Sequence, residues 1–214
     1  MQDIRQTLNY ANYLKSQEWV VERIDSINYF VKKIPILGSV LKIQRPKKIN
    51  FETIQKLERK YRVFQTVIEP NLSFANSFVS DHNLLLHNNY TLSKNPFLPS
   101  KTIQIDLTQS VDGIFRNFSK DARYSIKRGE TIKIKECNSP KDIENFYNVW
   151  KRSVKFNRYV PSLESLLNLR KSFPQKHSLF LTSHNKSGDI IGGAIFTTSS
   201  HGVSNYITYY WQGF

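Results

Sequence analysis

The spacing of apolar residues along the chain predicts five helices. Ile54, Leu57 and Tyr61 follow one another at steps of three and four, which is the spacing of one helical face. Asn50 precedes this stripe and can cap the first turn. The segment "SPKDIENFYNVWKRSVKF" carries a similar stripe behind a Ser-Pro start, which is typical of a helix N-terminus. The predicted helices lie within residues 1–30, 51–62, 110–128, 139–156 and 162–173.

Alternating apolar and polar residues, or short apolar runs bounded by turn residues, predict the strands. The alternation is clearest in "ETIKIKE", and the run "VFQTVIEP" is stopped by Pro70. Near the end, "NKSGD" and "SHG" have the composition of turns between three strands, so we expect an antiparallel meander there. The predicted strands lie within residues 28–36, 38–46, 63–70, 102–107, 130–136, 178–184, 189–199 and 203–211.

The order of these elements indicates an α+β protein built from two similar units. The second half runs strand, helix, strand, two helices and three strands, and the first half shows a looser form of this alternation. Residues 71–101 are rich in Asn, Ser and Pro, so they are expected to be irregular, with "NPFLPSK" as a boundary segment. We therefore divide the chain into residues 1–104 and 105–214.

The composition indicates that these units can bury a substantial core and that they carry a strong positive charge. Apolar residues make up 39% of the chain and include 14 Phe, 11 Tyr and 3 Trp. The 31 basic and 17 acidic residues give a formal net charge of +14. This excess favours polyanionic partners, namely nucleic acid, phosphorylated metabolites or an anionic membrane face, although a solvated lysine-rich surface gives the same count.

Several classes of site are disfavoured by the residues present. The single cysteine, Cys137, excludes an internal disulfide and a cysteine-based zinc site. The five histidines show no metal-ligand spacing, so no metal centre is expected. The run "IIGGAIF" is too short to span a bilayer, and the first residues lack the apolar core of a signal peptide. We expect a cytoplasmic protein that contacts the membrane, if at all, peripherally and through its charge.

One segment, "GIFRNFSKDARYSIKRGETIKIK", combines an apolar helical face with a neighbouring basic face. The basic face, called the basic stripe below, consists of Arg116, Lys120, Arg123 and Lys127. Like charges on neighbouring turns destabilise a helix, which favours a functional surface over an ordinary solvated face. We predict that the basic stripe faces solvent and binds phosphate groups along an extended ligand.

The same segment resembles a known protein family. "SKDARYSIKRGETIKI", after "TIQIDLTQSVDGIF", resembles the FemA/FemB/FemX family of peptidoglycan bridge-forming aminoacyltransferases, in which a strand ending in Asp-Leu leads to a helix with an Arg-rich end. Five further segments are similar to family segments in the same order: "YLKSQEW", "IPILGSVLKIQRP", "TVIEP", "FYNVWKRSVKFNRYVPSLESLLNL" and "GDIIGGAIFTTSSHGVSNYITYYWQGF". The resemblance covers nearly the whole chain and implies two GNAT-like (acyl-CoA N-acyltransferase-type) domains.

The resemblance implies an aminoacyltransferase. Family members move an amino acid from aminoacyl-tRNA to a side-chain amine of the cell-wall stem peptide, carried by lipid II or by UDP-MurNAc-pentapeptide. Because the amine attacks an activated ester, the protein mainly has to position two anionic substrates and stabilise the oxyanion. Aminoacyl-tRNA would be the co-substrate, and no cofactor is expected. Residues 154–179 leave no room for the coiled-coil arm of some members, so the basic stripe would contact the tRNA instead.

Four residues acquire a substrate-binding role through this resemblance. Arg23 falls where compact members place a Lys that binds the acceptor's diphosphate, and Arg adds a fork of donors. Family members place a second phosphate-binding Arg in the segment that corresponds to "KFNRYVP", and Arg158 is the basic residue of this chain nearest to that position. Tyr210 corresponds to an aromatic residue that lines the acceptor site, and Phe64 corresponds to a binding-site Tyr. The alternatives are an ordinary exposed helical arginine for Arg23 and a core position for the tyrosine.

The resemblance also predicts that the chain stops inside its second domain. The ending "YITYYWQGF" has the pattern of an interior strand. In the family, a helix, more strands and a Lys near the acyl-transfer centre follow the matching strand, so catalytic residues are expected beyond Phe214 and none is assigned before it. An aromatic strand with an open edge favours aggregation. We therefore expect the 214-residue chain alone to be inactive and poorly soluble, and a longer reading frame to restore both properties.

Two other functions stay open on the residues alone. An N-acyltransferase of the same fold that uses acyl-CoA would need a Gly-rich pyrophosphate loop at the start of a helix, whereas the glycines of "IIGGA" lie in a predicted strand. A non-enzymatic nucleic-acid-binding protein would explain the charge, but the chain has no recognised binding motif. The resemblance favours the aminoacyltransferase.

Overall fold

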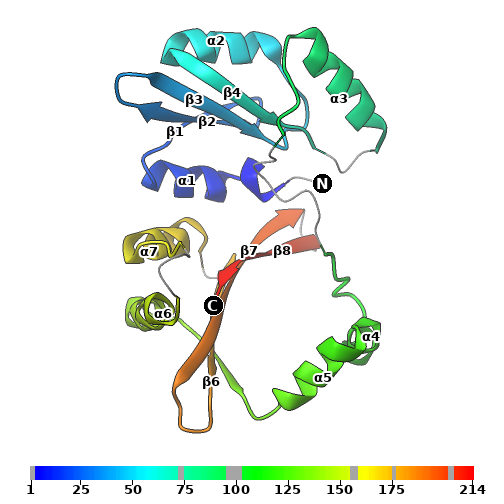
Figure 1. Cartoon of the computed structure of the whole chain (residues 1–214), viewed down its shortest axis with the longest axis vertical. Helices are drawn as coiled ribbons and strands as arrows, with labels where there is room; N and C mark the ends of the chain where they lie inside the picture. Colours follow the sequence, from blue (N-terminus) through cyan, green and yellow to red (C-terminus); the bar gives the residue numbers. More distant parts are fainter. Residues whose placement is uncertain (1–2, 72–74, 95–102, 155–158, 175–176, 202–204) are drawn as a thin grey trace.

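Two four-stranded sheets, one from each half of the chain, organise the structure (Figure 1). The computed structural model describes residues 3–71, 75–94, 103–154, 159–174, 177–201 and 205–214. In these residues the first sheet has the strand order β1-β2-β3-β4 and the second the order β5-β6-β7-β8. Helices and sheets alternate in both halves, which confirms the predicted α+β class.

The first sheet is a meander of three strands to which a fourth is added in parallel. Its strands are β1 (Val20–Ile24), β2 (Ile27–Ile34), β3 (Gly38–Gln44) and β4 (Val63–Glu69). The helix α2 (Phe51–Tyr61) carries the chain back across the sheet, so β4 pairs with β3 in parallel. Ile54 and Leu57 of α2 are buried against this sheet, as the helical stripe predicted, and the side chain of Asn50 caps the helix.

The second sheet is antiparallel throughout and has a separate core. Its strands are β5 (Lys133–Glu136), β6 (Ser178–His184), β7 (Ile190–His201) and β8 (Asn205–Gly213). Two helices, α6 (Pro140–Ser153) and α7 (Leu163–Ser172), pack on one of its faces (Figure 1). The predicted start of α6 is confirmed, because the side chains and backbone of Ser139 and Asp142 cap one another reciprocally.

A short N-terminal segment lies between the two sheets and packs on both. It consists of a 3₁₀ turn, η1 (Ile4–Gln6), and the helix α1 (Leu8–Ser16) (Figure 1). The ring of Tyr10 lies 5.6 Å from that of Phe30 in β2 and 5.9 Å from that of Trp211 in β8, measured between centroids. Ile4 belongs to the core of the second sheet. The two halves of the chain therefore share this segment, and the boundary near residue 104 stays a prediction.

The prediction that the first thirty residues are helical is wrong after Ser16. The chain turns at Gln17 and continues as β1, in which Val20, Val21 and Ile24 pair with β2. A two-residue turn joins these strands at Asp25 and Ser26, both with positive φ (50° and 63°). Such turns match the twist of a hairpin, but without a Gly this one carries a weak sequence signal.

The segment between the two sheets also differs from its prediction. Residues 71–101 are not irregular throughout, because α3 (Ala75–His87) lies among them. The boundary segment "NPFLPSK" falls outside the described residues. No strand forms over the described part of "TIQIDL": Ile103 is 91% exposed, and the Asp106 carboxylate instead accepts hydrogen bonds from Thr108 in a turn. Without a neighbouring strand to pair with, an alternating pattern does not form a strand.

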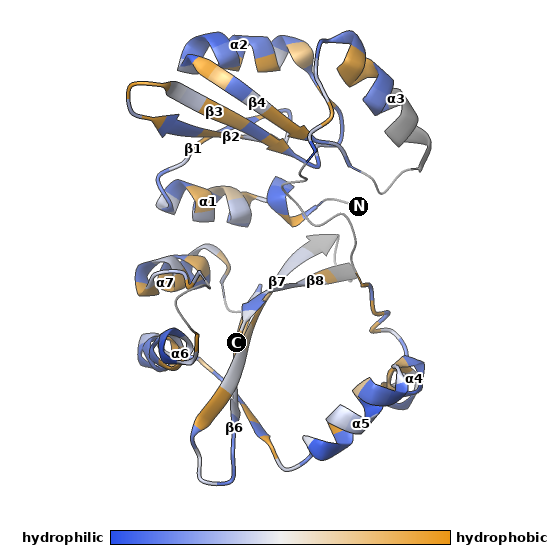
Figure 2. Cartoon of the chain, viewed as in Figure 1, coloured by the Kyte–Doolittle hydropathy of each residue, from blue (hydrophilic) through white to orange (hydrophobic). Residues whose placement is uncertain are grey.

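The predicted long helix from Ser110 to Arg128 is two helices. These are α4 (Val111–Asn117) and α5 (Lys120–Arg128), of which α5 is largely hydrophilic (Figure 2). The chain leaves the helical conformation at Phe118, and the Ser119 hydroxyl accepts a hydrogen bond from the backbone N–H of Ala122 at 3.2 Å. Serine favours such a capping position over a helix interior, so the break follows from Ser119.

Phe146 is the residue on which we expect the second core to depend most. Its side chain is fully buried, and its ring contacts those of Trp150, Phe180 and Phe214 at centroid distances of 5.8, 6.0 and 5.2 Å. Phe146→Ala should lower the free energy of unfolding of this unit by about 3–5 kcal/mol, because it leaves a cavity. Urea unfolding followed by tryptophan fluorescence measures the change. The exposed aromatic Tyr124 is the control: Tyr124→Ala should change the stability by less than about 0.5 kcal/mol.

Candidate functional site

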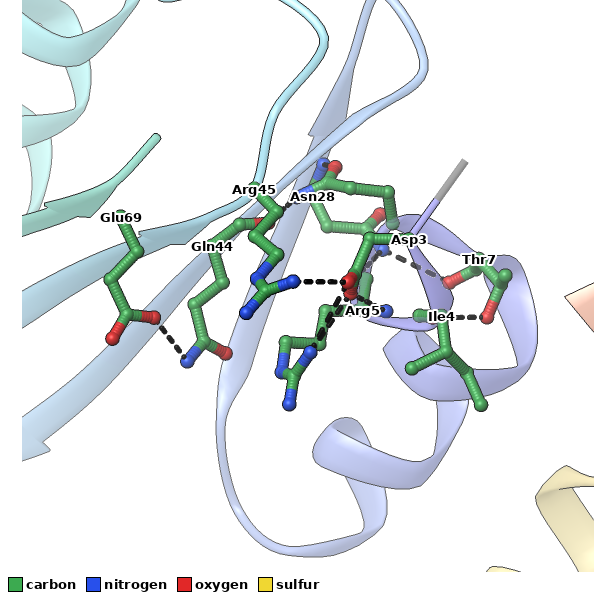
Figure 3. A network of polar contacts seen from close by, with 9 residues as sticks. Asp3, Ile4, Arg5, Thr7, Asn28, Gln44, Arg45 and Glu69 are labelled. Carbon is green, nitrogen blue, oxygen red and sulfur yellow. Dashed lines mark hydrogen bonds and ion pairs between the residues drawn. The ribbon is translucent and has the colours of Figure 1, made fainter. Parts of the chain in front are cut away.

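A group of charged and polar side chains gathers where the parallel strands β3 and β4 end. This inter-sheet cluster consists of Asp3, Arg5, Gln44, Arg45 and Glu69 (Figure 3). The carboxyl ends of parallel strands leave backbone groups and side chains available for ligands, which is why binding sites occur there. The cluster also lies near β8 of the second sheet, because Asp3 and Arg5 act electrostatically on Tyr209.

Asp3 is the centre of the cluster. Its side chain is only 8% exposed, and it accepts hydrogen bonds from the backbone N–H of Arg5 at 2.9 Å and from Arg5 Nη1 at 3.1 Å. Arg45 Nη1 approaches the other carboxylate oxygen at 3.8 Å. The described contacts use one terminal nitrogen of each arginine, and both side chains are partly exposed, at 22% and 27%. A second anion can therefore bind to the remaining donors of the two guanidinium groups.

The backbone directs Arg45 toward this cluster. Arg45 has a φ of 49°, which is uncommon for a residue other than Gly, and its N–H donates to the carbonyl of Glu69 at 2.7 Å. The Glu69 carboxylate in turn accepts a hydrogen bond from Gln44 Nε2 at 3.0 Å. Strained backbone at the end of a strand is held by the surrounding bonds and often marks a functional position.

A buried hydrogen-bond network, the η1 anchor, attaches the N-terminal segment to the first sheet. Its residues are Gln6, Arg23 and Asn28. Asn28 is fully buried, and its Nδ2 donates to the carbonyls of Arg5 and Thr7 at 2.9 and 3.0 Å. Arg23 Nη1 donates to Asn28 Oδ1 at 2.6 Å and to the Gln6 carbonyl at 2.9 Å. The anchor thus fixes the position of the neighbouring Asp3 and Arg5.

The structure places Arg23 in β1 and not on a helix, so the alternative of an ordinary exposed helical arginine is wrong. Its side chain is half-buried, and one of its terminal nitrogens is used in the η1 anchor. A contact with a diphosphate would use its other donors and stays a prediction.

The other sequence-predicted binding residues are not brought together with Arg23. Phe64 is 53% exposed and lines a pocket on the outer side of β4. Tyr210 is 63% exposed and packs its ring against Phe196. Within the described residues, no hydrogen bond, ion pair or ring contact joins either side chain to Arg23. Arg158 falls outside the described residues.

The basic stripe is divided between α4 and α5. Arg116, Lys120 and Lys127 are exposed, as predicted, and no ion pair to an acid involves the stripe in the described part of the chain. Arg123 differs, because its Nη1 donates to the carbonyls of Arg116 and Phe118 at 3.0 and 2.6 Å. It therefore caps the end of α4, and three of the four side chains are available to a ligand.

Sequence reasoning missed Asp3, Arg5 and Arg45, which are central to the cluster. Arg45 and Glu69 carried only a signal of position, as the Arg-Pro end of "IPILGSVLKIQRP" and the acid-Pro end of "TVIEP", and no role was predicted for either. Burial next to this cluster raises the pKa of Tyr10 to about 12, so its hydroxyl stays protonated at neutral pH. Among the described residues, no three His, Cys, Asp or Glu side chains lie close enough to hold a metal ion. None of the described helices has the length and apolar character needed to cross a membrane.

Comparison with solved structures relates this arrangement to a known fold. The crystal structure of FemX aligns with 86% of this chain at a TM-score of 0.65 and 12% sequence identity. The alignment covers 53% of FemX, so the chain spans about half the length of that protein. Neither a protein-family model nor a curated protein sequence matches the chain. The chain thus has the fold of FemX over most of its length, which confirms at the level of fold the resemblance indicated by its sequence segments.

The η1 anchor leads to a prediction about stability. Asn28→Ala should lower the free energy of unfolding by about 3 kcal/mol, because it leaves two carbonyls and a guanidinium donor without their buried partner. Urea unfolding at neutral pH measures the change. Asn12 of α1 is exposed, so Asn12→Ala is the matched control and should stay within about 0.5 kcal/mol of the parent. Equal stabilities of the two variants would show that the anchor does not hold the segment.

Proposed function

We propose that this protein is an aminoacyltransferase that forms interpeptide bridges of peptidoglycan. It moves an amino acid from aminoacyl-tRNA to the stem-peptide amine of lipid II or UDP-MurNAc-pentapeptide. The observation that carries the proposal is the alignment with FemX, which extends over 86% of the chain. It is supported by the order of the family-like segments in the sequence. The GNAT-like character of both units is part of this proposal.

The acceptor's diphosphate binds at the inter-sheet cluster in this proposal. Arg5 and Arg45 are held by Asp3 and retain unused guanidinium donors at a partly exposed position. Arginine forks match the paired oxygens of a diphosphate, and a partly buried site screens their attraction less than open solvent does. Arg23 adds its remaining donors to this site in the proposal, because Asn28 bonds both the Arg23 guanidinium and the backbone carbonyl of Arg5.

The aminoacyl-tRNA is contacted by the basic stripe. Arg116, Lys120 and Lys127 project from α4 and α5, which lie apart from α6 and α7 in Figure 1. Exposed cations along a helix bind the phosphate backbone of a nucleic acid without recognising its base sequence. Such binding suits a tRNA substrate, because the reaction takes place at its acyl group. The reaction itself is attack of the acceptor amine on the ester carbonyl carbon. The C–N bond forms, the bond to the tRNA oxygen breaks, and the amine proton leaves with the freed tRNA hydroxyl.

A transfer assay tests the function. The protein is incubated with UDP-MurNAc-pentapeptide or lipid II and a mixed pool of charged tRNA, and the mass of the acceptor is measured. We expect the acceptor to gain one or more aminoacyl residues. Acylation that requires acyl-CoA and ignores tRNA would favour the N-acyltransferase alternative. Binding of tRNA without any affinity for the precursor would favour a nucleic-acid-binding protein.

Arg23→Ala tests the acceptor site. Loss of a hydrogen bond to a charged group should weaken binding of UDP-MurNAc-pentapeptide by about 1.5–3 kcal/mol in calorimetry. Arg59 of the helix α2 is exposed and belongs neither to the η1 anchor nor to the inter-sheet cluster, so Arg59→Ala is the control and should bind as the parent does. An unchanged affinity of a folded Arg23→Ala protein would remove Arg23 from the site.

The basic stripe is tested by charge reversal. The double variant Lys120→Glu with Lys127→Glu should remain folded and should lower the salt dependence of tRNA binding by roughly 1–2 units of the log–log slope, because fewer counterions are released. Filter binding over a range of salt concentrations measures this slope. Lys171 and Lys186 are exposed elsewhere, so Lys171→Glu with Lys186→Glu matches the change in net charge. Equal slopes for the two double variants would contradict a role of the stripe.

A further inference from the structure

A second candidate site lies on the outer side of the first sheet. The pocket, called the edge pocket here, is bounded by residues 51–58 of α2, residues 63–66 at the start of β4, and residues 88–90 after α3. Its volume is about 360 Å³, which can hold a small ligand with one or two rings. Because β4 is the outer strand, no strand of the described part of the chain pairs with this side of the sheet, and the inter-sheet cluster lies at the other end of β4.

The edge pocket is not suited to an anion. The protein has a net charge of +14, yet none of the described residues that line this pocket is Lys or Arg. The one carboxylate among these described residues is Glu58, which accepts hydrogen bonds from Thr66 Oγ1 at 2.6 Å and from the Tyr90 hydroxyl. Burial and the nearby Glu58 raise the pKa of Tyr90 to about 12, so the tyrosine stays a neutral donor. Phosphates and carboxylates would meet a negative group and no positive one.

The polar lining instead suits a ligand with many hydroxyl groups. Four carboxamide side chains surround the pocket: Gln55, Gln65, Asn88 and Asn89. A carboxamide offers both a donor and an acceptor, as a hydroxyl group does, so the two kinds of group pair in either direction. The Glu58 carboxylate adds acceptor positions beyond those that Thr66 and Tyr90 use.

Aromatic rings supply the other feature of such a site. Phe64 is 53% exposed at the start of β4, and the rings of Phe51 and Tyr90 contact one another at 5.9 Å between centroids. The backbone next to Phe64 has an unusual conformation, because Arg62 has a φ of 50° and the neighbouring Gly38 has a φ of 110°. A Cβ on Gly38 would collide with the Arg62 carbonyl and would lie 3.7 Å from the Phe64 ring. An exposed aromatic ring can cover the apolar C–H face of a sugar.

We propose that the edge pocket binds a neutral saccharide ring, of which an N-acetylhexosamine is the simplest form with both hydroxyl and amide groups. Phe64 packs against one face of the ring, while the carboxamides and Glu58 hydrogen-bond its edge. The proposal depends on the lining of this pocket and holds whether or not the protein is an aminoacyltransferase.

Di-N-acetylchitobiose is the probe for the experiment, observed by saturation-transfer NMR and titration. We expect binding with a Kd on the order of 1 mM and a loss of roughly tenfold or more in Phe64→Ala. Tyr124→Ala removes another exposed ring, which lies outside the pocket, and should bind as the parent does. Absence of binding by the parent, or equal affinity of Phe64→Ala and Tyr124→Ala, would overturn the proposal. The exposed position of Phe64 keeps its variant folded, which a circular dichroism spectrum verifies.

A second pair of variants distinguishes a sugar from a cation. Glu58→Gln retains an acceptor for Thr66, so we expect saccharide binding to weaken only a few-fold, whereas Glu52→Gln, on the exposed side of the same helix, should have no effect. A small alkylammonium ion is the competing probe. If it binds in the pocket, fails to be displaced by di-N-acetylchitobiose and loses its affinity in Glu58→Gln, the site is cationic and the saccharide proposal is wrong.

Discussion

The hydrogen bonds of one buried amide, that of Asn28, determine how the two halves of the chain meet. A fully buried amide must be paired, and Asn28 pairs with the carbonyls of Arg5 and Thr7 and with the guanidinium of Arg23. These bonds hold η1 and α1 against the first sheet. From that position Ile4 enters the core of the second sheet, and Tyr10 contacts Trp211 of β8.

The inter-sheet cluster is a consequence of the same constraint. Asp3 and Arg5 lie at the start of the segment that Asn28 holds, while Arg45 and Glu69 lie at the ends of two parallel strands. Parallel pairing of β3 and β4 places both strand ends on one edge, and the anchored segment adds its own charges there. Guanidinium groups oriented by a buried carboxylate lose less conformational freedom when a further anion binds, which favours recognition of a diphosphate.

The surfaces of the protein differ in the ligand chemistry that they favour. The exposed cations of α4 and α5 suit a polyanion, because each adds a phosphate contact without strict geometry. The edge pocket has no basic residue among its described lining and combines amides with an exposed ring. The net charge of +14 therefore does not predict the ligand of any one site, because the residues that line a site determine which ligand it binds.

The sequence by itself determined most elements with a strong local signal. The stripe and cap of α2, the capping box of α6 and the closing strands were all predictable, because periodicity and caps act over a few residues. The resemblance to the FemX fold was also visible in the order of the segments. Tertiary structure decided what depends on partners distant in the chain. "TIQIDL" forms no strand in its described part because it has no neighbouring strand there. Asp3 and Arg45 meet across 42 residues, a juxtaposition that only the anchored N-terminal segment produces.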